Sequence, residues 1–205
     1  MGAPIFDRGA TQFELSDSIW TVPNFITLIR LALIPVFVWL VLGADERLAA
    51  AILLGVLGAT DWIDGYLARR LNQHSAFGKV LDPITDRLMF VVAIVTMIID
   101  GSVPRWFAFA VLFREIVVSL AALGIGALGV RSIDVTWWGK VATFGLMFTF
   151  PFFLGSYSDV SSTLTDTWRV VAWAIGIPSL VLSYLAGFGY IPIAREALAQ
   201  SRASS

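Results

Sequence analysis

The sequence predicts an all-α membrane protein with six transmembrane helices and a short amphipathic segment at its N-terminus. Three observations lead to this fold class. The composition is 58% hydrophobic and 14% charged, whereas soluble domains carry about 25% charged residues. Six stretches are apolar over about the 20 residues that a helix needs to cross the hydrocarbon layer. The basic residues between these stretches are also distributed unequally between the two sides.

The six predicted spans are joined by short connections and by one longer loop over residues 156–167, which contains no Lys or Arg. Tryptophans open the fifth and sixth spans, as residues anchored at a membrane interface do. The predicted spans are residues 22–42, 47–71, 78–99, 104–129, 137–155 and 168–190.

The distribution of basic residues predicts the orientation in the membrane. Ten of the 14 Lys and Arg residues fall on the side of the two termini, and three fall on the opposite side. Because cytoplasmic loops are the ones enriched in Lys and Arg, we expect cytoplasmic termini in the plasma (inner) membrane. Residues 1–20 form a polar N-terminal arm and residues 191–205 a C-terminal tail, and residues 1–205 are expected to form a single domain.

The rarest residue types exclude several classes of chemistry. The chain has no cysteine and one histidine, His74. Disulfides, thiolate nucleophiles, zinc–thiolate sites and iron–sulfur clusters are therefore excluded, and most His-dependent catalysis lacks its residues. No basic stripe is present, so we expect no nucleic acid as a partner.

Four aspartates between positions 61 and 86 stand out in this apolar chain. Each costs about 2.5–3.5 kcal/mol in a transmembrane segment, which favours a functional role. If two helices face each other across residues 70–77, the four charges converge on one point, and only a bound cation stabilises such a point. On helices, two sets of residues each share one face: Asp61, Asp64, Gly65 and Ala68, and then Gly78, Asp82 and Asp86.

The ligand types favour a particular metal and substrate. Oxygen ligands without cysteine or histidine suit a hard cation such as Mg²⁺ or Mn²⁺. Arg69 lies one helical turn beyond Gly65, where a guanidinium can bind phosphate oxygens beside the metal. Small residues on the same face allow a bulky group to approach the backbone. The pattern therefore indicates a nucleotide diphosphate held by two metal ions, as in phosphoryl transfer.

The same residues spell D-x2-D-G-x2-A-R-x8-G-x3-D-x3-D, which resembles the signature of the CDP-alcohol phosphatidyltransferase family. The resemblance implies six transmembrane helices, a cytoplasm-facing site, a homodimer and a divalent-metal mechanism. It also implies that Asp86 is the base that takes a proton from the acceptor hydroxyl. It assigns two metal ions to Asp61, Asp64, Asp82 and Asp86. It assigns the CDP pocket to Gly65, Ala68, Arg69 and Gly78.

The resemblance implies a reaction in which CDP-diacylglycerol donates a phosphatidyl group to a hydroxyl acceptor and CMP is released, in anionic phospholipid synthesis. Residues 21–31, 81–83, 114–116 and 135–145 resemble the branch that contains phosphatidylglycerophosphate synthases, which favours glycerol-3-phosphate as the acceptor. The sequence departs from that branch after Ser119, where Leu-Ala-Ala stands in place of an Arg-Glu pair. The alternative acceptor is phosphatidylglycerol, as in a cardiolipin synthase of this family.

Both acceptors carry a phosphate, so a cation is expected beside the metal site. Arg114 on the fourth span and Lys140 at the start of the fifth are the candidates for this contact. The alternative for Arg114 is an internal ion pair with Glu115, and for Lys140 a side chain that reaches the membrane interface.

One hypothesis from another class is a cation-coupled membrane carrier that uses the aspartates as its ion site. It explains the carboxylates, but it leaves the small residues and the arginine of the signature without a role. It predicts ion-driven uptake into vesicles and no release of CMP.

Overall fold

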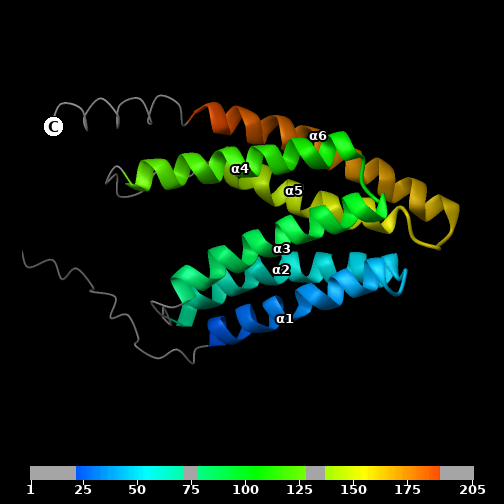
Figure 1. The fold of residues 1–205 in the computed structure, drawn as a ribbon, viewed down its shortest axis with the longest axis horizontal. Helices are drawn as coiled ribbons and strands as arrows, with labels where there is room; N and C mark the ends of the chain where they lie inside the picture. The colour runs from blue at the N-terminus through cyan, green and yellow to red at the C-terminus, as the bar shows by residue number, and fades with distance from the viewer. Residues whose placement is uncertain (1–21, 72–77, 128–136, 190–205) are drawn as a thin grey trace, which may run out of the picture.

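The structure, a computed structural model, describes residues 22–71, 78–127 and 137–189. In these residues every regular element is a helix, and the helices run alternately in opposite directions (Figure 1). The all-α class is therefore confirmed, while residues 1–20 and 191–205 lie outside the described part. The helices are α1 (Val22–Leu42), α2 (Arg47–Leu71), α3 (Gly78–Asp100), α4 (Arg105–Ala127), α5 (Trp137–Gly155) and α6 (Ser162–Phe188).

The last helix differs from its predicted extent, because α6 begins at Ser162 rather than at Trp168. Its first turns are polar, which is why the sequence suggested a loop there. The hydroxyls of Thr165 and Thr167 donate back to the carbonyls of Ser162 and Thr163, at 2.9 and 2.7 Å. These bonds satisfy the hydroxyls within the helix, so polar residues can occupy its first turns. The predicted loop over residues 156–167 is thus half helix.

The interior is built around α5, which packs most extensively against α6 and also contacts α2. Two glycines allow α5 and α6 to approach closely. A Cβ atom at Gly145 of α5 would lie 2.0 Å from the Ser179 hydroxyl, and one at Gly176 of α6 would lie 2.8 Å from Thr149. Phe107 of α4 then fills the centre, with its ring against Phe150 and Phe153 and other aromatic rings.

The other half of the bundle is organised by α1, which packs against both α2 and α3. At the end where α2 begins and α3 finishes, Arg47 of α2 binds Asp100 of α3. Its Nε and Nη2 donate to the two carboxylate oxygens at 3.1 and 2.9 Å. Gly101 follows in the left-handed region, with φ of 79°, which ends α3 as such a glycine commonly does.

In the part of the chain that the structure describes, two helices are long and apolar enough to cross a membrane by length and composition, α1 over Asn24–Leu42 and α6 over Ser162–Gly187. Large apolar side chains are nevertheless exposed on every described helix. Examples are Trp39 of α1, Ile52 of α2, Ile99 of α3, Phe113 of α4, Trp137 of α5 and Val170 of α6.

Candidate active site

The signature lies on α2 and α3, at the end of the bundle where α1, α3 and α5 begin (Figure 1). Asp61 and Asp64 are in the second half of α2, and Gly78 is the first residue of α3. Both stretches are continuous helix, so spacings of i+3, i+4 and i+7 in the first set, and of i+4 and i+8 in the second, put each set on one side of its helix. The six residues between Leu71 and Gly78 keep the two helix ends within reach of each other.

Most side chains of the signature lie outside what the structure describes. Their assignment to metal ions and to CDP therefore stays a prediction. The residues concerned are Asp61, Asp64, Gly65, Ala68, Arg69, Gly78 and Asp82. Within the described residues, no group of three or more acidic or histidine side chains gathers as a metal site would require.

Asp86 is the signature residue whose side chain is described, and it contacts an arginine from another helix. Arg30 of α1 donates from Nη1 to Asp86 Oδ1. The Arg30 side chain is 2% exposed, whereas that of Asp86 is 33% exposed. Thr27 and Asn24, about one and two turns earlier on α1, are also buried. Helix α1 is apolar overall, but it has buried polar side chains at the end of the bundle where the signature lies.

The contact of Arg30 with Asp86 was not predicted from the sequence, although the sequence does show a polar side of α1. Asn24, Thr27 and Arg30 follow one another at intervals of three residues, which keeps them on one side of a helix. Polar residues repeated at helical spacing in a membrane span face the protein interior rather than lipid. The partner of Arg30 was not predictable, because it lies 56 residues further along the chain.

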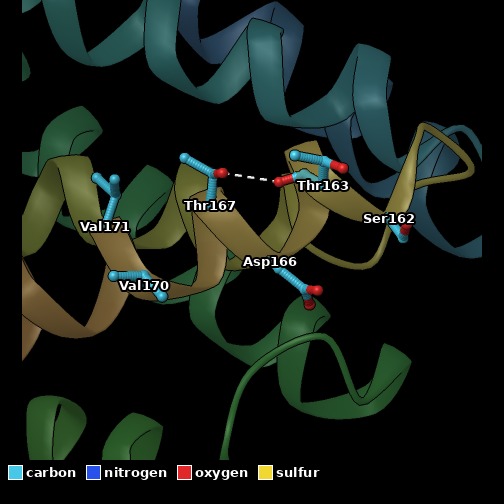
Figure 2. A pocket seen from close by; sticks show the side chains of 6 residues that line it. All are labelled: Ser162, Thr163, Asp166, Thr167, Val170 and Val171. Atoms are coloured by element: carbon cyan, nitrogen blue, oxygen red, sulfur yellow. Dashed lines mark hydrogen bonds between the residues drawn. The ribbon is translucent and has the colours of Figure 1, made fainter.

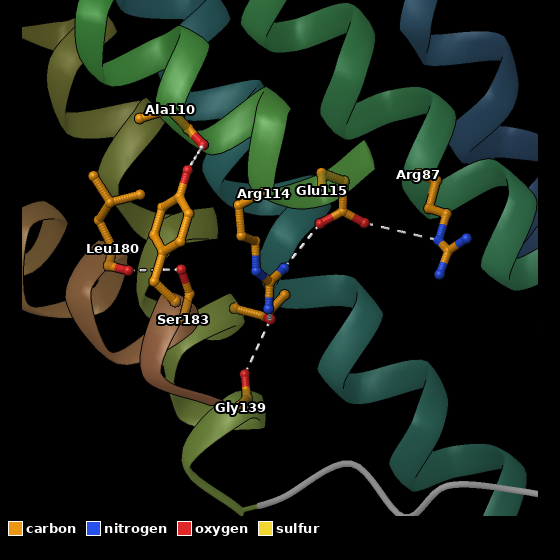
Figure 3. A network of polar contacts seen from close by, with 9 residues as sticks. Arg87, Ala110, Arg114, Glu115, Gly139, Leu180 and Ser183 are labelled. Atoms are coloured by element: carbon orange, nitrogen blue, oxygen red, sulfur yellow. Dashed lines mark hydrogen bonds and ion pairs between the residues drawn. The ribbon is translucent and has the colours of Figure 1, made fainter. Parts of the chain in front are cut away.

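A second polar group joins α3, α4 and α5 (Figure 3). Glu115 of α4 lies between two arginines, 2.9 Å from Arg114 Nη1 and 3.8 Å from Nε of Arg87, the residue after Asp86. Arg114 Nη2 also donates to the Thr143 hydroxyl of α5 at 3.4 Å. Arg114 is therefore part of an internal ion pair, the alternative considered for it, and a phosphate contact for the same side chain stays a prediction.

Lys140, the other candidate for the acceptor phosphate, is exposed near the start of α5. It precedes Thr143 by three residues, so the two lie one helical turn apart. Because Arg114 reaches Thr143, the structure brings both candidate cations to the same part of α5.

A pocket of about 470 Å³ lies elsewhere, on the first turns of α6 (Figure 2). Asp166 is the one carboxylate among its lining residues, and the Thr167 hydroxyl is already bonded to the Thr163 carbonyl. The pocket is at the end of the bundle opposite the signature (Figure 1). Because it is lined by a single carboxylate, it does not offer the group of carboxylates that the predicted chemistry needs.

A helical bundle with paired carboxylates at one end is the architecture expected of a metal-dependent phosphotransferase in a membrane. The chain matches the CDP-alcohol phosphatidyltransferase family over residues 20–184 and belongs to it. This confirms the resemblance based on the signature. It also confirms that the chain is an enzyme, a phosphatidyltransferase of phospholipid synthesis.

Three relatives show the range of named activities around this chain. Cardiolipin synthase (CMP-forming) of Streptomyces coelicolor is 34% identical over 195 residues, which are 93% of this chain and 89% of the relative. The CDP-diacylglycerol–glycerol-3-phosphate 3-phosphatidyltransferase of Haemophilus influenzae is 36% identical, over 68% of this chain and 78% of the relative. Its Bacillus subtilis counterpart is 33% identical, over 68% of this chain and 83% of the relative.

Proposed function

We propose that the protein transfers a phosphatidyl group from CDP-diacylglycerol to a glycerol hydroxyl of a phosphate-bearing acceptor and releases CMP. The observation that carries this proposal is the complete signature on α2 and α3, within a chain that matches the family over residues 20–184. The names of the relatives support the donor, since the two bacterial 3-phosphatidyltransferases are named for CDP-diacylglycerol.

Two divalent cations, Mg²⁺ or Mn²⁺, are the proposed cofactors, and the donor set suits them. Four carboxylates from two helices are ligands that hard cations prefer, and the one histidine, His74, stands outside the positions of the signature. Bound there, the cations would supply charge neutralisation for the pyrophosphate and for the leaving CMP. The proposed ligands are Asp61, Asp64, Asp82 and Asp86, and the proposed CDP contacts are Gly65, Ala68, Arg69 and Gly78.

Asp86 is proposed as the base for the acceptor hydroxyl. The acceptor oxygen attacks the phosphorus of the phosphatidyl group, the bond from that phosphorus to the CMP oxygen breaks, and the hydroxyl proton passes to the Asp86 carboxylate. A carboxylate is a much weaker base than an alkoxide, so it accepts the proton in concert with the attack. The partial exposure of the Asp86 side chain leaves room for an acceptor to approach it.

The membrane arrangement is also a proposal: six spans, with the termini and the site facing the cytoplasm in the plasma membrane, and a homodimer. Exposed large apolar side chains on all six described helices support contact with lipid. The excess of basic residues on the side of the termini supports the orientation. CDP-diacylglycerol would then reach the site from the bilayer.

Phosphatidylglycerol is the acceptor that we favour, and glycerol-3-phosphate is the second candidate. The relative that covers nearly the whole chain is named a cardiolipin synthase. Glu115 also neutralises part of the charge of Arg114 and Arg87, which suits a singly charged diester better than a monoester with more charge. Glycerol-3-phosphate is supported by the two relatives named for it.

The test supplies purified protein with CDP-diacylglycerol and Mg²⁺ or Mn²⁺, and offers each acceptor separately. We expect release of CMP and formation of cardiolipin with phosphatidylglycerol. Formation of phosphatidylglycerophosphate instead would select the second candidate. Excess EDTA should stop CMP release, and activity that persists in EDTA would contradict the metal assignment. Ion-driven uptake into vesicles without any CMP release would support the carrier hypothesis instead.

A further inference from the structure

In the contact between Arg30 and Asp86, the arginine is the more deeply buried of the two partners. The arginine side chain is 2% exposed and the carboxylate 33% exposed. A buried guanidinium on a helix apolar enough to cross a membrane is costly unless a carboxylate compensates it. The contact places a buried positive charge against a carboxylate whose side chain remains partly exposed.

The turn of α3 that carries Asp86 is held from two directions. Arg30 reaches Asp86 from α1, while the next residue, Arg87, faces Glu115 of α4 at 3.8 Å. Successive residues on a helix point about 100° apart, so the two contacts limit rotation of α3 in different directions. Arg30 of α1 therefore contacts the Asp86 carboxylate directly, and the longer contact of the half-exposed Arg87 with α4 adds a weaker restraint on the same turn.

An arginine suits this position for a geometric reason. Its guanidinium is planar and rigid, so a hydrogen bond from Nη1 fixes the direction of the carboxylate as well as its charge. A lysine would keep the charge but not the direction. A neutral residue would remove both the charge and the Nη1 hydrogen bond that Arg30 gives to the carboxylate.

We propose that Arg30 is a positioning residue, which holds the Asp86 carboxylate in the orientation that accepts the proton of the acceptor hydroxyl. This inference rests on the proposed function, because it assumes that Asp86 takes part in phosphatidyl transfer. It gives α1 a role in the reaction in addition to its place in the membrane. The competing explanation is that the pair only fastens α1 to α3.

The test compares Arg30→Met and Arg30→Lys in the full-length protein, with kcat, KM for CDP-diacylglycerol and the thermal unfolding midpoint measured for each. Displacement of a reacting group by about 1 Å can cost about 10²-fold in rate. We expect Arg30→Met to lower kcat by about that factor, with KM changed less than about threefold. Arg30→Lys should restore about tenfold of this loss, since it returns the charge without the planar group.

The matched control is Arg47→Met, which breaks an arginine–aspartate pair on the same helix α3 at its other end. It should lower the unfolding midpoint and leave the kcat of the folded enzyme unchanged. If Arg30→Met behaves like this control, the pair only fastens two helices and the inference is wrong. A rise in KM with unchanged kcat would also overturn it, by placing Arg30 in substrate binding.

Two further outcomes keep this inference separate from the proposed function. If the unaltered protein releases no CMP with any acceptor, the proposed function fails before Arg30 is tested. If Arg30→Met does not fold, Arg30→Lys and Arg30→Gln carry the comparison. Full kcat in both of these milder variants would contradict the inference.

Discussion

Two arginine–aspartate pairs join α3 to its neighbours, and they are built in opposite ways. Near the end of α3, Asp100 is 6% exposed and accepts two hydrogen bonds from Arg47, which is itself 23% exposed. Near the beginning of α3, the Arg30 side chain is buried, whereas the Asp86 side chain is partly exposed. The two aspartates are about 21 Å apart along the helix. The Arg47–Asp100 pair buries its carboxylate, as structural ion pairs do, whereas the Arg30–Asp86 pair leaves its carboxylate partly exposed to solvent.

In a buried ion pair, the exposure of the carboxylate distinguishes a structural role from a reactive one. A carboxylate that is enclosed and fully bonded can do little except stabilise the fold. A carboxylate that is bonded to a buried arginine but remains partly exposed to solvent can still accept a proton or bind a cation. By this criterion we expect Asp100 to have a structural role and Asp86 a role in the reaction.

The largest effect should come from Asp86→Asn, which keeps the shape of the side chain and removes its charge and basicity. We expect kcat to fall by at least about 10³-fold, because both proton transfer and ligation depend on the carboxylate. CMP release reports the rate, and nucleotide binding measured separately should largely persist. Substantial activity in this variant would remove Asp86 as the base and with it the contrast between the two pairs.

Arg47→Met should act on stability alone. It leaves the enclosed Asp100 carboxylate without its two hydrogen bonds, at a cost of about 1–3 kcal/mol in the free energy of unfolding. Thermal unfolding in detergent measures the loss. The double variant Arg47→Met with Asp100→Leu should recover much of it, since an apolar pair can replace a buried ion pair. No recovery would mean that the pair does more than hold α2 to α3.

Lys140→Ala tests a cation that belongs to neither pair. If Lys140 binds the acceptor phosphate, its loss should raise KM for the acceptor by about tenfold, the value of one charge-assisted hydrogen bond. KM for CDP-diacylglycerol should change little. A larger change in the KM of the donor than in that of the acceptor would assign Lys140 to the nucleotide.

The smallest effect is expected for Asp45→Asn. Asp45 is 70% exposed and lies 2.6 Å from Arg47, and exposed ion pairs contribute less than about 1 kcal/mol. Asp45 also has a φ of 58°, a conformation that asparagine tolerates and alanine does not. The unfolding midpoint should therefore fall more for Asp45→Ala than for Asp45→Asn. The opposite order would show that the charge of Asp45, and not its backbone, matters at this end.

The sequence by itself determined the helices and the family. Apolar stretches of spanning length predicted all six helices, four of them to within about one residue at their described ends. Only α6 starts well outside its predicted range, because its polar first turns bond within the helix. The signature identified the chemistry because its residues recur at fixed short intervals, and a helix turns such intervals directly into a shared face.

The tertiary structure decided which side chains meet between helices. Arg30 finds Asp86 across 56 residues, and Glu115 lies between Arg87 and Arg114. These contacts depend on how far each helix is rotated about its axis and on how closely neighbours pack, which glycines such as Gly145 control. Spacing along the chain carries no direct record of that rotation. The aspartates of the signature could therefore be named from sequence, whereas the contact of Arg30 with Asp86 appeared only when the helices were assembled.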